Sequence, residues 1–170
     1  MGWRERVRQF RAAAAPRFTD ADAHFVTLWL TQPERRLFAR QSAYEQQHAV
    51  ALARRVLAGG LPTSRELIAA TLLHDVGKTA ASLHRWQRVL FVLLAAIPGQ
   101  PLQRLSPAAR GPWRGLWVLQ HHPALGAGLA RQAGVNDRIA WLIAHHHDPL
   151  ADQELHRLQA ADNGSPPAPV

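Results

Sequence analysis

The chain has 170 residues and no cysteine, which excludes disulfides and thiolate metal ligands. Any metal ion must be bound by imidazole and carboxylate groups, which suit divalent manganese, iron, zinc or magnesium. A formal charge of +8 favours an anionic small-molecule partner, and the arginines are too widely spread to favour nucleic acid. The longest apolar run, 89–97, is shorter than the roughly 20 residues of a membrane span, and no signal-peptide core follows the first arginines. We therefore expect a cytoplasmic protein.

Helix signals follow one another along the chain and strand alternation is nearly absent, which predicts an all-α fold, a compact bundle of six to eight helices. Residues 1–41 contain short helical pieces broken at Pro16 and Pro33, and we expect this extension to pack on the main domain. The main domain is predicted to cover residues 42–163. Residues 164–170 have the composition of a disordered tail.

Helix boundaries in the main domain are predicted from capping and stop residues. Ser, Thr, Asn and Asp side chains cap helix N-termini, whereas Gly and Pro commonly mark helix ends. Two of the caps are strengthened by a glutamate three residues further on, Glu45 and Glu66. From first signal to last, the expected helices are 42–59, 63–77, 82–98, a short piece at 106–111, 123–134, 136–149 and 152–163.

Metal-ligand side chains continue the apolar stripe of a predicted helix near the C-terminus. A residue three, four or seven positions from an apolar residue shares its face of the helix. In the helix that starts at Asn136, the stripe through Ile139 and Ile143 continues to His146 and His147. His145 is off this face, so the inward histidines are expected to be the second and third of the triplet.

On other predicted helices, too, the apolar stripe continues into metal-ligand side chains. The stripe through Ile68 and Leu72 leads to Asp75, beside His74, and another stripe leads to Asp162. His48 lies on an inward position of its own helix. A carboxylate on a core-facing stripe is costly unless it is paired or binds a metal ion, so these positions predict ligands that converge between helices.

The motif HDVGK at 74–78 contains Lys78, the single lysine among twenty basic residues. Lysine has a compact, rotatable ammonium group where arginine has a planar fork. This position therefore favours a cation that can meet a phosphate beside two metal-ligand side chains.

The order of these candidate ligands resembles the signature of the HD-domain superfamily of metal-dependent phosphohydrolases, an all-helical fold. That signature is a His, a later His-Asp pair and a final Asp, matched here by His48, His74, Asp75 and Asp162. The resemblance covers roughly residues 42–163. HDVGK, HPALG at 122–126 and HHD at 146–148 are similar to the HDIG-type branch, which is related to the HD-GYP phosphodiesterases. Aspartate replaces the usual glutamate in the last motif, and no GYP sequence follows. The missing GYP sequence weakens the expectation that the chain cleaves cyclic dinucleotides.

The resemblance implies one or two divalent metal ions bridged by Asp75, with Lys78 facing the phosphate; these two residues would be catalytic. The implied activity is hydrolysis of a phosphate ester or diester of a nucleotide-like substrate. Either Asp148 or His121 would act as a supporting partner or proton carrier. The implied metal ligands are His48, His74, Asp75 and Asp162 for one ion and His122, His146 and His147 for the other.

Two alternatives remain open from the sequence. The first is a catalytically inactive metal-binding HD domain that acts as a sensor or docking module. The second is a peripheral membrane or nucleic-acid binder that uses the apolar helix around Trp86 and the arginines between residues 4 and 11. We favour a buried central helix for this apolar run, because nine consecutive apolar residues in a compact helical chain usually lie in the core.

Overall fold

The computed structural model describes residues 18–95, 102 and 105–164. The first part of the N-terminal extension, with its arginine cluster, lies outside the described residues. So do the expected helix end at Pro98 and all but the first residue of the predicted tail.

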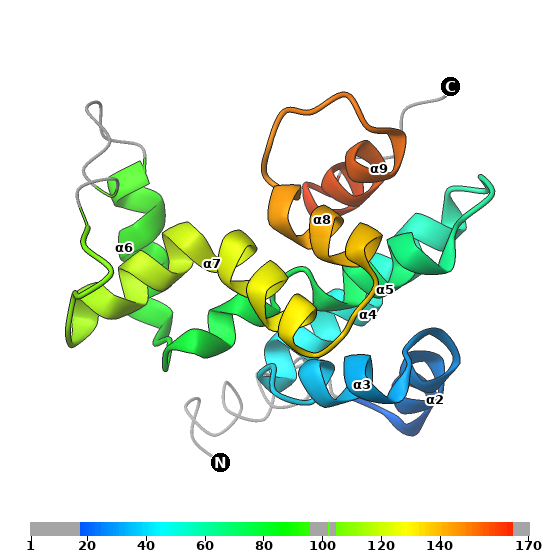
Figure 1. The fold of residues 1–170 in the computed structure, drawn as a ribbon, viewed down its shortest axis with the longest axis horizontal. Coiled ribbons are helices and arrows are strands. Elements are labelled where there is room, and N and C mark those ends of the chain that lie inside the picture. Colours follow the sequence, from blue (N-terminus) through cyan, green and yellow to red (C-terminus); the bar gives the residue numbers. More distant parts are fainter. Residues whose placement is uncertain (1–17, 96–101, 103–104, 165–170) are drawn as a thin grey trace, which may run out of the picture.

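The described residues form eight α-helices and one 3₁₀-helix, and they contain no strand (Figure 1). The predicted all-α fold is therefore confirmed. The helices are α2 (Asp20–Trp29), α3 (Gln32–Phe38), α4 (Ala43–Ala58), α5 (Arg65–Leu73), η1 (Val76–Ala80), α6 (Arg85–Ala95), α7 (Pro112–Gln132), α8 (Asp137–His145) and α9 (Gln153–Asp162).

Three of the predicted caps are present, and a fourth is displaced by one residue. Ser42 caps α4 in a reciprocal capping box, and Asn136 and Asp152 cap α8 and α9. The predicted cap at Thr63 was wrong, because Ser64 accepts the backbone N–H of the third helical residue instead. The Thr63 hydroxyl donates to the carbonyl of Leu61 and so stabilises the preceding turn.

Three predicted helix boundaries between residues 74 and 123 were also wrong. The helix expected to reach Gly77 ends at Leu73 as α5, and the tighter η1 follows. The helix expected from Ser82 begins at Arg85. The piece expected from Ser106 is a turn, because the Ser106 side chain and carbonyl accept the N–H groups of the next two non-proline residues.

The largest difference concerns Pro123, which was expected in the first turn of a helix and lies in the interior of α7. This helix begins eleven positions earlier, at Pro112, after Gly111 with its positive φ of 56°. A proline at the first position of a helix loses no hydrogen bond, and a glycine accepts the left-handed backbone before it. The start at Pro112 therefore satisfies local preferences, while packing against η1 and α8 keeps the chain helical through Pro123.

The centre of the molecule is α5, which contacts α3, α4, α8 and α9 (Figure 1). Every residue from Leu67 to Gly77 is buried. A helix that is apolar on all sides is stable only when other helices surround it. Val26 of α2, Leu30 directly after α2 and Phe38 of α3 belong to this same core. The buried centre thus holds the end of α5, where the HDVGK motif begins.

The prediction that the apolar run at 89–97 forms the central helix was wrong. Its described part, α6, lies against α7 at the opposite end of the molecule from α2 (Figure 1). Val89, Val92 and Leu93 are each more than 60% exposed, and Trp86 is also exposed. No helix within the described ranges is both long enough and apolar enough to cross a membrane.

Candidate metal centre

Three of the predicted ligand histidines are fixed by the same local hydrogen bond. In each, ring Nδ1 lies 2.8 Å from the carbonyl oxygen three residues earlier. A carbonyl can only accept, so Nδ1 carries a proton, and whenever the ring is neutral its lone pair is on Nε2. Such a bond is the usual support of a metal-binding imidazole. The pairs are His74 with Thr71, His122 with Leu119, and His146 with Ile143.

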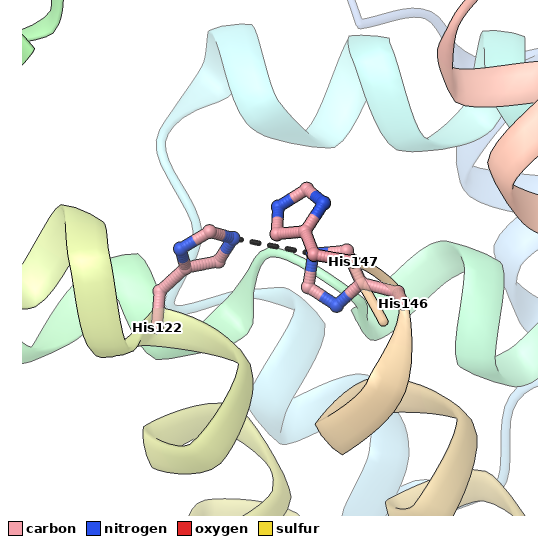
Figure 2. A group of neighbouring side chains, drawn as sticks. All are labelled: His122, His146 and His147. Atoms are coloured by element: carbon pink, nitrogen blue, oxygen red, sulfur yellow. Dashed lines mark hydrogen bonds between the residues drawn. The ribbon is translucent and has the colours of Figure 1, made fainter. Parts of the chain in front are cut away.

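His122, His146 and His147 form one group at the meeting point of α7 and the end of α8 (Figure 2). The Nε2 atoms of His122 and His146 are 3.2 Å apart. The ring of His147 lies 4.0 Å from that of His146 and 5.2 Å from that of His122, between centroids. His122 and His146 are buried and His147 is exposed, so the group opens toward the surface through His147.

His48, His74 and Asp162 form a second group, contributed by α4, the end of α5 and the end of α9. His48 Nε2 lies 3.1 Å from Asp162 Oδ1. This hydrogen bond, opposed by burial, lowers the pKa of Asp162 to about 2, so the carboxylate is ionised at neutral pH. The group joins residues that are 114 positions apart in the chain.

Asp75 lies between the two groups. Its Oδ1 is 3.3 Å from His122 Nε2, and its Oδ2 is 3.5 Å from His74 Nε2. Burial acts to raise the pKa of Asp75, but His74 and His122, when their rings are protonated, and the Lys78 ammonium hold this pKa well below its usual value. One buried, ionised carboxylate thus faces an imidazole of each group.

Lys78 lies in η1, one turn after Asp75, and its Nζ is 2.6 Å from Asp75 Oδ2. The lysine side chain is 17% exposed and the aspartate 6%. The ammonium is therefore at the centre, paired with the carboxylate that separates the two histidine groups.

The donor atoms of both groups fit divalent cations. His122 and His146 both have Nδ1 protonated, so their facing Nε2 atoms carry no proton between them when the rings are neutral. Burial and the neighbouring histidines lower the pKa of His146 to about 2, which keeps this ring neutral. Two nitrogens bound to one ion at about 2.1 Å lie roughly 3.0–3.4 Å apart, which agrees with the observed spacing. A cation would relieve the repulsion of the facing lone pairs.

Two histidines next to the first group in sequence, His121 and His145, have other partners. His145 packs on Trp141, with ring centroids 4.9 Å apart, and its Nδ1 lies 2.6 Å from Asp148 Oδ2. His121 stacks on Trp117 at 4.6 Å. The structure thus brings His146 and His147 to His122 and turns His145 away, as expected from helical periodicity. The expectation that His147 points into the core was wrong, because α8 ends at His145 and His147 is exposed.

A pocket of about 370 Å³ opens beside the first group. His122 and His147 form part of its wall, and Phe91 of α6 closes another side. Sequence reasoning did not find this pocket, because it depends on how α6, α7 and α8 pack. The other lining residues are Leu119, Gln120, His121, Pro123, Ala124, Ala144 and Asp148.

The HDVGK and HPALG motifs are in contact through their glycines, a relation that the sequence did not reveal. A Cβ atom on Gly77 would overlap the carbonyl oxygen of His122 and lie 2.6 Å from the backbone nitrogen of Gly126. A Cβ on Gly126 would lie 3.1 Å from the Gly77 nitrogen. These two glycines let η1 and α7 approach closely, which brings Asp75 and His122 together.

A fully helical fold with imidazoles and carboxylates gathered between five of its helices defines a metal-binding helical domain. Residues 46–165 match the family model described as HD domain. This match covers most of the chain, so the protein belongs to the HD domain family, whose members are generally metal-dependent phosphohydrolases. No curated protein and no solved structure matches the chain.

Proposed function

We propose that this protein is a metal-dependent phosphohydrolase that acts on a phosphate ester or diester of a nucleotide-like molecule. The observation that carries the proposal is the position of Asp75, a buried, ionised carboxylate with one oxygen near His122 and the other near His74. Such a carboxylate suits the bridging position between two divalent cations. The motifs HDVGK, HPALG and HHD further support a place among HDIG-type members of the family.

Divalent ions held by these residues would supply Lewis-acid chemistry at the phosphoryl group and activate a water molecule for attack. The chain itself would supply ligand orientation, through the three Nδ1 bonds, and a mobile cation, Lys78. In the metal-loaded protein, Lys78 would exchange its bond to Asp75 for one to a phosphoryl oxygen, because the ions compete for the carboxylate.

The pocket beside His122 and His147 is where the organic part of the substrate would bind. Its wall combines apolar groups, such as Phe91 and Leu119, with the amide of Gln120 and the ring of His121. Pockets of this composition bind largely apolar groups and orient them through a few polar contacts. A nucleobase has these properties, and the net charge of +8 favours the approach of its phosphate.

The test combines elemental analysis of the purified protein with hydrolysis assays. The substrates are nucleoside monophosphates, cyclic dinucleotides and simple phosphomonoesters, each with added manganese, iron or magnesium. In Asp75→Ala we expect metal content and turnover to fall together, since both histidine groups lose the shared carboxylate. Full metal content in this variant would overturn the assignment of the site.

His145→Ala is the matched control, because His145 belongs to the same triplet but packs on Trp141. We expect it to keep both metal and turnover. Bound metal without turnover of any phosphate ester in the wild type would replace the proposal with its alternative, an inactive HD domain that serves as a sensor or docking module.

A further inference from the structure

Pro123 directly follows a candidate metal ligand, His122, in the interior of the 21-residue helix α7. In a helix, the N–H group of residue 123 would donate to the carbonyl oxygen of residue 119. Proline has no N–H, so this position costs the helix one hydrogen bond and crowds the same carbonyl. The cost indicates that the released carbonyl of Leu119 has another use.

The Leu119 carbonyl accepts a hydrogen bond from His122 Nδ1 at 2.8 Å. This bond places the proton of the neutral ring on Nδ1 and leaves the Nε2 lone pair free. That Nε2 atom faces Asp75 Oδ1 at 3.3 Å and His146 Nε2 at 3.2 Å. The carbonyl that Pro123 releases thus sets both the tautomer and the direction of His122.

The other two histidines with this bond need no proline, because they lie at helix ends. His74 is the C-cap residue of α5, and His146 is the C-cap residue of α8. Their acceptors, Thr71 and Ile143, belong to the last helical turn, where carbonyls have no intrahelical donor. His122 alone of the three is in mid-helix, where a carbonyl is ordinarily already bonded.

The helix cannot simply end at His122 to release the carbonyl. The residues after His122 pack closely on η1. A Cβ added at Gly126 would lie 3.1 Å from the Gly77 nitrogen and 3.3 Å from Val76 Cγ1. This contact holds η1, which follows Asp75 directly. The centre therefore needs a helix that continues past His122 and a carbonyl that is free within it.

We propose that Pro123 is a positioning residue of the metal centre: by removing one backbone donor from α7, it reserves the Leu119 carbonyl for His122 Nδ1 and so presents His122 Nε2 to a cation. The inference rests on the metal centre of the proposed function but not on turnover. This role of Pro123 is separate from its position in the wall of the pocket.

The test is Pro123→Ala, which returns the missing N–H while keeping a small side chain. We expect a thermal midpoint equal to or above that of the wild type, since α7 gains a hydrogen bond. Calorimetric titration with Zn²⁺ should show affinity weakened about tenfold or more for the ion at His122, the usual effect of removing such support. Binding at His48, His74 and Asp162 should be unchanged.

Pro112→Ala is the control, because Pro112 occupies the first position of the same helix, where an N–H has no helical acceptor. We expect wild-type Zn²⁺ binding in this variant. Equal Zn²⁺ affinities in Pro123→Ala and Pro112→Ala would overturn the proposal.

A second readout needs no metal. Ring ¹⁵N shifts of His122 in the metal-free protein at alkaline pH should show the Nδ1-protonated tautomer in the wild type and a mixture of tautomers in Pro123→Ala. Unchanged shifts would overturn the proposal by themselves. If the shifts change as expected but the wild type binds no divalent ion, the effect of Pro123 on the His122 tautomer stands and the proposed metal-dependent function fails.

Discussion

At the scale of single residues, Glu34 is a buried charged residue that lies away from the metal centre and is stabilised by an ion pair. Its side chain is 2% exposed and accepts two hydrogen bonds from Arg65, at 2.9 and 3.2 Å. Burial acts to raise the pKa of Glu34, but the bonds from Arg65 and Thr31 lower it below its usual value. This residue therefore joins the start of α3 to the start of α5.

The lowered pKa of Glu34 gives a pH-dependent prediction. A carboxyl group with a lower pKa in the folded state contributes stability above its unfolded pKa, about 4.3, and loses it as the pH falls through the folded value. We expect Glu34→Gln to lower the free energy of unfolding by roughly 1.5 kcal/mol at neutral pH, the lower range for a charged hydrogen bond because Arg65 is partly exposed.

Urea unfolding of both proteins at neutral and acidic pH measures this effect. The difference between Glu34→Gln and the wild type should shrink as the pH drops below about 4. A difference that stays constant through the acidic range would contradict the role assigned to the charge.

Residue identity and helical period were sufficient to predict much of the candidate site. The apolar stripe of α8, continued past the helix end at His145, placed His146 and His147 on the side of Ile139 and Ile143 and His145 off it. The cap of α5 was less determined, since Thr63 and Ser64 both offer a hydroxyl and only the folded turn decides between them. The Nδ1 bonds could not be predicted, because they depend on which carbonyls are free.

At the scale of helices, the contact of η1 with α7 depends on two glycines. Gly77 faces the backbone of α7, and a Cβ there would overlap the His122 carbonyl oxygen. Backbone atoms of a packed helix cannot move away as a flexible side chain can. We therefore expect Gly77→Ala to lower the free energy of unfolding by about 2–3 kcal/mol and to reduce metal content.

Gly128→Ala, in the same helix α7, is the matched control. A Cβ at Gly128 meets no atom within 4 Å, so the substitution should only add helix propensity. We expect stabilisation of roughly 0.5–1 kcal/mol, with wild-type metal content. Thermal unfolding and elemental analysis check both variants, and equal effects of the two alanines would refute the close approach.

The misplaced helices have a common physical cause. The sequence marks Pro123 as a helix start and the apolar run of α6 as a core segment, since local signals weigh each segment alone. In the folded protein, packing against η1 and α8 carries α7 through Pro123, and α5 takes the central place because its buried face extends all around. Tertiary contacts outweigh a single proline or the hydrophobicity of one run.

At the scale of the whole molecule, the candidate ligands join the two ends of the main domain. They come from α4, α5, α7, α8, α9 and the residues directly after them, from His48 to Asp162. An ion bound only by the folded state stabilises it by about 2.7 kcal/mol at a free concentration 100 times the dissociation constant. For a chain of this size we expect chelation to lower the thermal midpoint by roughly 5–10 °C.

Calorimetry of the metal-loaded and chelated protein measures this shift. Adding back Mn²⁺ or Zn²⁺ should restore the midpoint in the wild type and in His145→Ala, but not in Asp75→Ala. An unchanged midpoint on chelation of demonstrably bound metal would show that the ions do not connect the helices.

The pairing of Lys78 with Asp75 has a practical consequence. Because this chain has one lysine, an amine-directed acylating reagent can modify one side chain besides the α-amino group. That ε-amino group is held 2.6 Å from Asp75 at the centre of the molecule. The rate at which this single amine is acylated, followed by intact mass, therefore reports whether metal ions are bound at Asp75.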